Sequence, residues 1–210
     1  MKPVIPIRLA VEDELSEWVV RRALATRPAN YFVGPVYSRG GFGYLKNKAR
    51  AFNNAAQSCP FLLLTDLDQC PCPPQLIEDW LGCPKHPHLL LRVAVREVES
   101  WLLGDPAGLR AFLGLRKSFD FDAPEQMADP KQELLKLALS SPRRDMRDAL
   151  AWQNAAGGRL FQGPDYNATL AKFVMNAWNV ETARGKCRSL DRLFLALSRI
   201  EAEFSRGGFI

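Results

Sequence analysis

The sequence has few of the residues and motifs on which several large protein classes depend. Its 210 residues include only two histidines and no G-x-S-x-G motif, so a serine or cysteine hydrolase with a histidine base is not supported. No Walker A motif is present, and an ATPase acting with this protein would therefore be a separate chain. No stretch approaches the roughly 20 apolar residues of a membrane helix, so we expect no membrane partner.

Cysteine is also scarce, and the five cysteines form no regular framework. An odd number without a pattern is typical of reduced thiols in a cytosol. Cys70, Cys72 and Cys83 do lie near His86 and His88, but their spacing matches no standard zinc finger or ribbon. Thiols in a proline-rich loop are the favoured interpretation, and zinc binding stays open.

Composition and charge indicate a globular protein with a mild preference for polyanions. Hydrophobic residues make up 47% of the chain, which excludes a disordered protein. Lys and Arg number 28 against 23 Asp and Glu, giving a net charge of +5. The N-terminal "MKPVIPIRLAVEDE" is a poor signal peptide and a good first strand, so we expect a cytoplasmic location.

Strand and helix patterns alternate over the first hundred residues. Apolar runs at 4–12, 30–38, 61–66 and 88–95 predict four strands, and the segments 13–26, 44–57 and 73–82 predict the helices between them. Such alternation indicates a mostly parallel four-stranded α/β sheet with flanking helices. After residue 96 no convincing strand appears, and we expect an α/β domain over 1–104 with a helical C-terminal extension over 105–210 packed on it.

Acidic residues follow three of the four predicted strands. Glu12 ends the first, Asp66 and Asp68 end the third, and Glu97 and Glu99 follow the fourth. Because parallel strands all end at one edge of a sheet, where open α/β sheets bind ligands, these five carboxylates should converge. Each alone could be a helix cap, a turn or a solvated residue, but together they predict a site for Mg²⁺ or Mn²⁺.

The same segments carry a family resemblance. "LAVEDELSEWVV" followed by "LLLTDLD" resembles the TOPRIM (topoisomerase–primase) domain, which has Glu after its first strand and Asp-x-Asp after its third. "VREVESWLLGD" is similar to the Glu-x-Glu segment of a TOPRIM-like family of bacterial proteins of unassigned function, related to OLD-type and phage-defence nucleases. The likeness extends through "DPKQELL", "GPDYN" and "SLDRL". Two positions depart from the pattern: Asp13 replaces the usual Gly, and Cys70 replaces a third Asp.

The resemblance implies a TOPRIM-like, Rossmann-like fold and Mg²⁺-dependent cleavage of phosphodiester bonds in nucleic acid, DNA or RNA, in a mobile-element or phage-defence setting. Glu12 would be a ligand or the general base, and Asp66 and Asp68 the principal metal ligands. Glu97 or Glu99 would complete a second metal site. No organic cofactor is implied.

Two alternatives stay open. One is a non-catalytic TOPRIM-like module that binds nucleic acid or protein and keeps its acids for the fold. The other is a metal-dependent glycosyl- or nucleotidyltransferase that uses the Asp-x-Asp motif, although Glu12 would then have no role.

Basic residues surround the glycine-rich segment "SRGGFGYLKNKARAFNN" at the same edge of the predicted sheet. Glycine loops and helix N-termini bind phosphates, and cations neutralise a nucleic-acid backbone. Arg39, Lys46, Lys48 and Arg50 are therefore candidate nucleic-acid contacts, and a solvated helix face is the equally open alternative.

Overall fold

The computed structural model describes residues 4–38, 40–154 and 158–207, which divide into two compact units. Residues 1–95 and 189–210 belong to the first, here called the sheet unit, and residues 96–188 form the second, the helical unit. The sequence places the boundary at residue 104. In the structure it falls directly after Val95, and the C-terminal segment belongs to the sheet unit.

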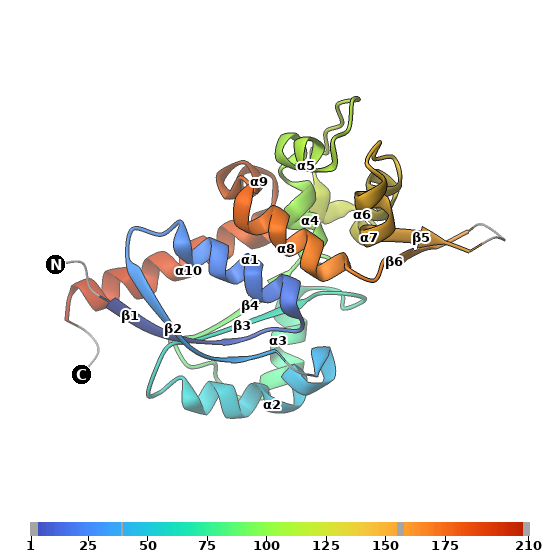
Figure 1. The fold of residues 1–210 in the computed structure, drawn as a ribbon. Coiled ribbons are helices and arrows are strands. Elements are labelled where there is room, and N and C mark those ends of the chain that lie inside the picture. Colours follow the sequence, from blue (N-terminus) through green and yellow to red (C-terminus); the bar gives the residue numbers. More distant parts are fainter. Residues whose placement is uncertain (1–3, 39, 155–157, 208–210) are drawn as a thin grey trace. The chain divides into compact units, whose positions relative to one another are not determined.

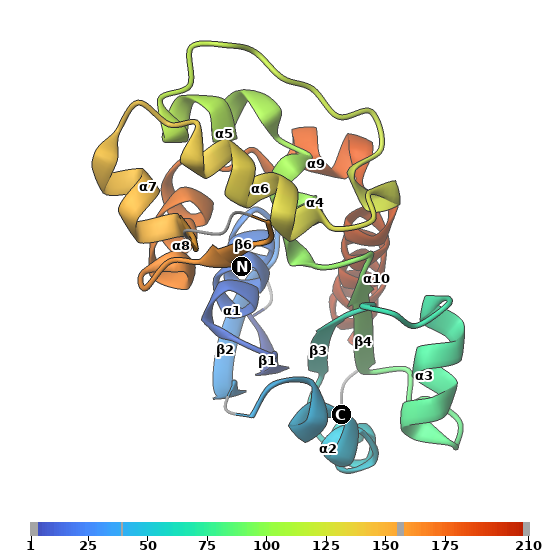
Figure 2. The ribbon, with the colours of Figure 1, turned by 90° about the vertical axis from the view of Figure 1, so that its right-hand side faces the viewer.

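The sheet unit contains four parallel strands in the order β2-β1-β3-β4 (Figure 1). Helices α1 and α10 cover one face of this sheet and α2 and α3 the other, as the rotated view also shows (Figure 2). The predicted α/β class with a four-stranded parallel sheet is confirmed. The elements are β1 Val4–Ala10, α1 Glu14–Ala25, β2 Asn30–Tyr37, α2 Gly41–Ala55, β3 Phe61–Asp66, α3 Pro73–Leu81, β4 Leu89–Ala94 and α10 Arg188–Ser205.

β3 is apolar over most of its length because it lies inside the sheet, between β1 and β4. Leu62, Leu63 and Leu64 are fully buried, as expected for a strand with both faces covered by helices. The apolar run stops before Asp66, which pairs in register with Ala94 of β4. The predicted bounds of this strand, 61–66, are confirmed.

Asp13, one of the two departures from the TOPRIM pattern, begins α1. Its backbone is extended (φ −147°), and its side chain accepts a hydrogen bond of 2.8 Å from the backbone N–H of Ser16. A carboxylate at this position satisfies a free N–H of the first turn and interacts favourably with the positive end of the helix dipole. Asp13 is therefore the N-cap of this helix.

The C-terminal helix α10 is tied to the sheet unit at several points. The backbone N–H of Val95, just past β4, donates to Ser189 Oγ at 3.2 Å. Near the other end of the helix, Glu201 accepts hydrogen bonds from Arg27 Nε at 2.9 Å and Tyr31 Oη at 3.0 Å. The side chains of Arg27 and Glu201 are each only 12% exposed, so this charged pair holds α10 against the segment that leads from α1 into β2.

The helical unit has its own core, built around tryptophans. Trp101 and Trp178 are fully buried, and Trp178 Nε1 donates to the carbonyl of Trp101. Asp105 is also buried and accepts from the N–H groups of Gly108 (3.0 Å) and Asn179 (2.7 Å), which joins two helix starts. The elements are α4 Val98–Leu103, α5 Pro106–Leu113, η1 Pro124–Gln126, α6 Pro130–Leu139, α7 Arg144–Leu150, β5 Ala151–Gln153, β6 Leu160–Gln162, α8 Tyr166–Asn176 and α9 Val180–Lys186.

The expectation that no strand follows residue 96 is wrong. β5 and β6 pair as a short antiparallel hairpin. Trp152 of this hairpin is 49% exposed and stacks on Phe161, with ring centroids 4.6 Å apart. Strands of three residues are too short to show a period of two, so no local pattern marks them.

The described ranges contain no helix that could span a membrane. None of the helices there combines the length and the apolar character that crossing a bilayer requires.

Candidate metal centre

The acids after the strands lie where the parallel sheet predicts them. Asp66 ends β3, and Glu97 follows β4 by three residues. Since Asp66 pairs with Ala94 and the N–H of Leu67 donates to the Ala94 carbonyl at 2.9 Å, the β3–β4 ladder itself brings Asp66 close to the segment that carries Glu97. The pairing of β3 with β4 therefore positions these acids.

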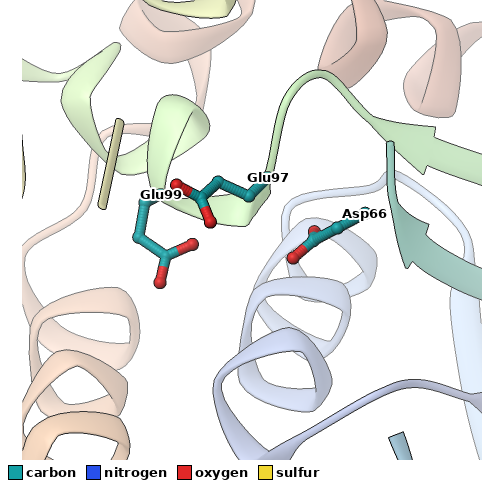
Figure 3. A group of neighbouring side chains, drawn as sticks. All are labelled: Asp66, Glu97 and Glu99. Atoms are coloured by element: carbon teal, nitrogen blue, oxygen red, sulfur yellow. The ribbon is translucent and has the colours of Figure 1, made fainter. Parts of the chain in front are cut away.

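Asp66, Glu97 and Glu99 form a group whose carboxylate oxygens, one from each residue, all lie within 4.8 Å of one another. Figure 3 shows the three carboxyl groups as neighbours. It is the one grouping of three or more His, Cys, Asp or Glu side chains with metal-ligand spacing in the described ranges. Three of the five predicted acids are thus brought together.

The spacing of these oxygens suits a divalent cation. Two oxygens on opposite sides of Mg²⁺ lie about 4.2 Å apart, and on opposite sides of Ca²⁺ about 5 Å apart. At least two of the three oxygen pairs would be neighbours around an octahedral Mg²⁺, about 3.0 Å apart, so oxygens within 4.8 Å of one another would move inward to bind the ion. Three carboxylates are a hard, oxygen-only donor set, which Mg²⁺ and Mn²⁺ prefer.

Glu97 is held by the start of α6. Its Oε1 accepts a hydrogen bond of 2.7 Å from the backbone N–H of Lys131, and its Oε2 lies 3.3 Å from Lys131 Nζ. The residue also occupies the N-cap position of α4, where its own carbonyl accepts from the N–H of Ser100 at 3.0 Å. The two contacts with Lys131 fix the direction of the Glu97 carboxylate before any ligand binds.

Glu99 is the most buried acid of the group, with 3% of its surface exposed. Tyr166 Oη donates to its Oε1 at 2.9 Å, and Lys131 Nζ lies 3.3 Å from the same oxygen. Burial raises the pKa of Glu99 to about 7, and the charge of Glu97 also raises it, while Lys131 and the Tyr166 hydroxyl lower it. The ammonium of Lys131 is thus a cation shared by both glutamates.

Glu12 is not one of the three grouped acids, although it lies beside Asp66 in the sheet. Its Oε1 accepts from the backbone N–H of Asp66 at 3.0 Å and from the hydroxyl of Thr65. Burial raises its pKa, and the two hydrogen bonds oppose that effect. Glu12 therefore fixes the end of β3, and its role as a ligand or general base stays a prediction.

Asp68 is exposed and lies in a turn after β3. Its φ of 48° is the single positive value of a non-glycine residue in the described ranges. Aspartate tolerates this left-handed conformation better than most residues. The turn is closed by a hydrogen bond of 3.0 Å from the N–H of Cys70 to the carbonyl of Leu67. Asp68 does not belong to the three-acid group, and its role as a principal ligand stays a prediction.

The basic residues near the glycine turn divide into two kinds. Lys46 and Lys48 are exposed on α2, whereas Arg50 Nε donates to the carbonyl of Leu81 at 2.6 Å, near the end of α3. Arg39 lies outside the described residues. Gly40 has a φ of 126°, and a Cβ there would lie 2.6 Å from Tyr44 Cβ, so this turn requires glycine.

The cysteines and histidines do not gather as zinc ligands in the described ranges. All five cysteines are free thiols. His88 Nε2 pairs with Glu203 at 2.7 Å, Cys83 Sγ contacts Asn53 Nδ2 at 3.7 Å, and Cys70 Sγ contacts a backbone carbonyl. These contacts agree with loop thiols, the interpretation that the sequence favours.

Sequence reasoning did not identify three polar residues that contact the acids. Thr65, Lys131 and Tyr166 lie in the segments "LLLTDLD", "DPKQELL" and "GPDYN" of the family resemblance, but the sequence patterns assigned none of them a role at the site. Lys131 directly follows the Asp-Pro that begins α6, and Tyr166 begins α8. Sequence alone shows two helix starts there, and only the fold of the helical unit shows that both reach Glu99.

Comparison with known proteins adds no relative from which a function could be transferred. No protein-family model, no curated protein and no solved structure matches this chain.

Proposed function

We propose that this protein is a Mg²⁺- or Mn²⁺-dependent hydrolase of phosphodiester bonds in nucleic acid. The observation that carries the proposal is the convergence of Asp66, Glu97 and Glu99 at the ends of two adjacent parallel strands. Ligands of open α/β sheets bind at this edge, and a buried carboxylate such as Glu99 is stable in its charged form only beside a cation.

Each acid has a distinct part in this proposal. Asp66, Glu97 and Glu99 would hold the ion, and Glu12 would keep Asp66 in place through the hydrogen bond to its backbone N–H. A bound divalent ion supplies Lewis acidity, lowers the pKa of water and clamps the scissile phosphate. The start of α2, with Gly40 and the exposed Lys46, offers backbone N–H groups and positive charge for a phosphate of the substrate.

The TOPRIM resemblance supports the same proposal and makes it finer. A Glu after the first strand, an Asp at the end of the third and a Glu-x-Glu after the fourth correspond to Glu12, Asp66 and the pair Glu97 and Glu99. We therefore extend the proposal to a TOPRIM-like nuclease, acting alone or with a separate ATPase, in a mobile-element or phage-defence setting.

One observation favours a second candidate, a non-catalytic module. Lys131 Nζ lies 3.3 Å from an oxygen of Glu97 and 3.3 Å from an oxygen of Glu99, so part of the negative charge is already neutralised. If this ion-paired state persists in the presence of Mg²⁺, the acids serve the fold. The two candidates differ in whether the ion displaces the ammonium.

The test combines metal binding with cleavage in the same samples. Mn²⁺ titration calorimetry and cleavage of single- and double-stranded DNA and RNA would be measured for wild type, Asp66→Asn and Glu78→Gln. Glu78 is an exposed acid on α3 and serves as the matched control for loss of one charge. We expect Asp66→Asn to lose both binding and cleavage, and Glu78→Gln to keep both.

Two results would count against the proposal. Wild type that binds no Mn²⁺ at millimolar concentration would leave the non-catalytic module as the better description. If wild type and Asp66→Asn cleave equally, the cleavage comes from a contaminating nuclease.

A further inference from the structure

A loop of the helical unit separates two pockets. It joins α5 to η1, and the pockets have volumes of about 530 and about 570 Å³. Arg116, Ser118 and Phe119 line both. The first pocket is mainly apolar, with Leu115, Leu137 and Pro142 in its wall, and the second contains Arg110. One loop therefore offers an apolar recess and a cationic recess side by side.

Within the described residues, the cations of this loop and of the adjoining end of α5 have no acidic partners. The side chains of Arg110, Arg116 and Lys117 make no hydrogen bond or ion pair in that part of the chain. Elsewhere in the helical unit, Arg143 pairs with Asp145 at 2.6 Å and Arg144 with Asp148 at 3.3 Å.

Asp120, an acid that lines the second pocket, is neutralised by a lysine that does not line it. Asp120 pairs with Lys186 of α9, and the pKa of Asp120 is lowered by this contact. Asp122 is the other acid of this loop, so Arg110, Arg116 and Lys117 leave an excess of positive charge around the two pockets.

The loop is held in position before a ligand binds. The N–H of Leu115 donates to the carbonyl of Arg110 at 3.0 Å, after Gly114 has turned the chain with a φ of 70°. The rings of Phe119 and Phe121 lie 5.5 Å apart, and the ion pair of Asp120 holds the far end. A positioned loop loses little conformational entropy on binding.

We propose that this surface, the two pockets around 115–120, binds a nucleotide of a single-stranded nucleic acid. The base would occupy the apolar pocket against Phe119, and the phosphates would contact Arg110, Arg116 and Lys117. The inference rests on the proposed function for its substrate class and adds that the strand is unpaired at this point. It concerns binding only, so it requires no metal.

The combination of recesses favours an unpaired strand over other anions. Inorganic phosphate would need the cations but not the apolar pocket. A duplex keeps its bases stacked, so none could enter the recess beside Phe119. Stacking on an aromatic ring together with backbone neutralisation is the general mode of single-strand recognition.

The test is fluorescence anisotropy with a labelled single-stranded oligonucleotide in EDTA, so that cleavage and metal binding play no part. Variants would be Arg116→Ala/Lys117→Ala and Phe119→Leu. The matched control is Arg144→Ala/Arg159→Ala, which removes the same charge from exposed, ion-paired positions of this unit. Far-ultraviolet circular dichroism and thermal melting would establish that every variant is folded.

We expect the Arg116→Ala/Lys117→Ala variant to bind at least tenfold more weakly, with the salt slope reduced by about 0.7 for each phosphate that the variant no longer neutralises. Phe119→Leu should weaken binding about fivefold or more without changing the salt slope. The control should stay within about twofold of wild type. Nucleoside monophosphate should compete with the labelled strand, and this competition should also depend on Phe119.

The inference fails if wild type does not bind the strand, if the control and the loop variant are equally weakened, or if inorganic phosphate competes as well as the nucleotide does. Direct binding of a fluorescently labelled nucleoside monophosphate, with no affinity for the strand, would assign the pocket to nucleotides and overturn the single-strand assignment. Loop-dependent binding without Mn²⁺-dependent cleavage would refute the proposed function and keep this inference. Mn²⁺-dependent cleavage that is insensitive to the loop variants would support the proposed function and refute this inference.

Discussion

The backbone N–H of Asp66 donates a hydrogen bond of 3.0 Å to the side chain of Glu12, which joins the ends of β3 and β1. These are neighbouring strands at the point where the chain order of the sheet reverses, because β2 lies on one side of β1 and β3 on the other. Ligand sites of open α/β sheets form at such a point. The contact therefore lies at the position where the fold class predicts function.

Replacing Glu12 should separate its structural part from any part in metal binding. Glu12→Ala leaves the hydroxyl of buried Thr65 without this acceptor, so we expect a loss of about 1–3 kcal/mol in the free energy of unfolding. Glu12→Gln keeps an acceptor oxygen and should lose less. Urea denaturation of both variants measures this difference. Equal stability of wild type and Glu12→Ala would show that the hydrogen bonds do not hold the strand end.

Mn²⁺ affinity of the same variants tests the role that the sequence predicts. If Glu12 only positions Asp66, Glu12→Gln should bind Mn²⁺ within about tenfold of wild type, which is about 1.4 kcal/mol. Asp66→Asn should lose far more, since Asp66 belongs to the three-acid group. An equal loss in both variants would instead establish Glu12 as a ligand.

Glu99 should make the metal-free protein less stable at higher pH. Burial raises its folded pKa to about 7, above the ordinary value of 4.5, so the folded state takes up the proton more readily than the unfolded state. Its stabilising contribution is full below pH 4.5 and is lost as the pH rises through 7. Glu99→Gln cannot ionise and should be the more stable protein above pH 7.

The measurement is urea denaturation in EDTA at about pH 5 and about pH 8. The gain in stability of Glu99→Gln over wild type should be larger at the higher pH. Glu181→Gln, an exposed acid on α9, is the control and should show no such trend. A gain that is equal at both pH values would mean that Glu99 is already ionised at the lower one.

Lys131→Met should make the protein depend on metal. The substitution keeps an apolar chain but removes the ammonium 3.3 Å from both Glu97 and Glu99, which leaves two carboxylates in repulsion. We expect a lower melting temperature in EDTA and a larger stabilisation by Mn²⁺ than in wild type. Occupancy at a hundred times the dissociation constant contributes about 2.7 kcal/mol. Lys136→Met, on the same helix, is the control, and equal responses to Mn²⁺ in both variants would contradict the shared site.

Replacing the basic residues of α2 should have two different effects, one on stability and one on nucleic-acid binding. Arg50→Ala removes the donor to the Leu81 carbonyl, so it should lower the free energy of unfolding by about 1 kcal/mol. Lys46→Ala/Lys48→Ala should leave stability unchanged and weaken nucleic-acid binding, with a flatter salt dependence. Thermal melting and binding titrations of the same preparations distinguish the two. Unchanged binding of the lysine variant would identify this face as solvated surface.

The elements that sequence could predict are those whose local pattern decides their structure. β3 has a continuous apolar run ended by Asp66, and α3 starts with Pro73 and is followed by Gly82 in the left-handed conformation. Both patterns follow from burial and from backbone chemistry within a few residues. The acids could be placed for the same reason, since a strand end fixes where the next side chain lies.

What sequence could not predict depends on tertiary packing. The apolar stripe of α10 shows that the helix packs on something, but not that its partner is the sheet unit rather than the adjacent helices. Lys131 and Tyr166 reach Glu99 through the fold of the helical unit, and no local spacing connects them. The three-acid group itself required the β3–β4 register, which places Asp66 opposite Ala94.

The hydrogen bond between Val95 and Ser189 has a consequence for the order of folding during synthesis. Residues 96–188 leave and rejoin the sheet unit at two positions joined by this bond of 3.2 Å, so the helical unit is an insertion within another domain. The ribosome completes all four parallel strands early, but α10 emerges only after the whole insertion. One face of the sheet near β4 therefore stays uncovered until α10 has been synthesised. The inserted domain is continuous in sequence, so it can fold first.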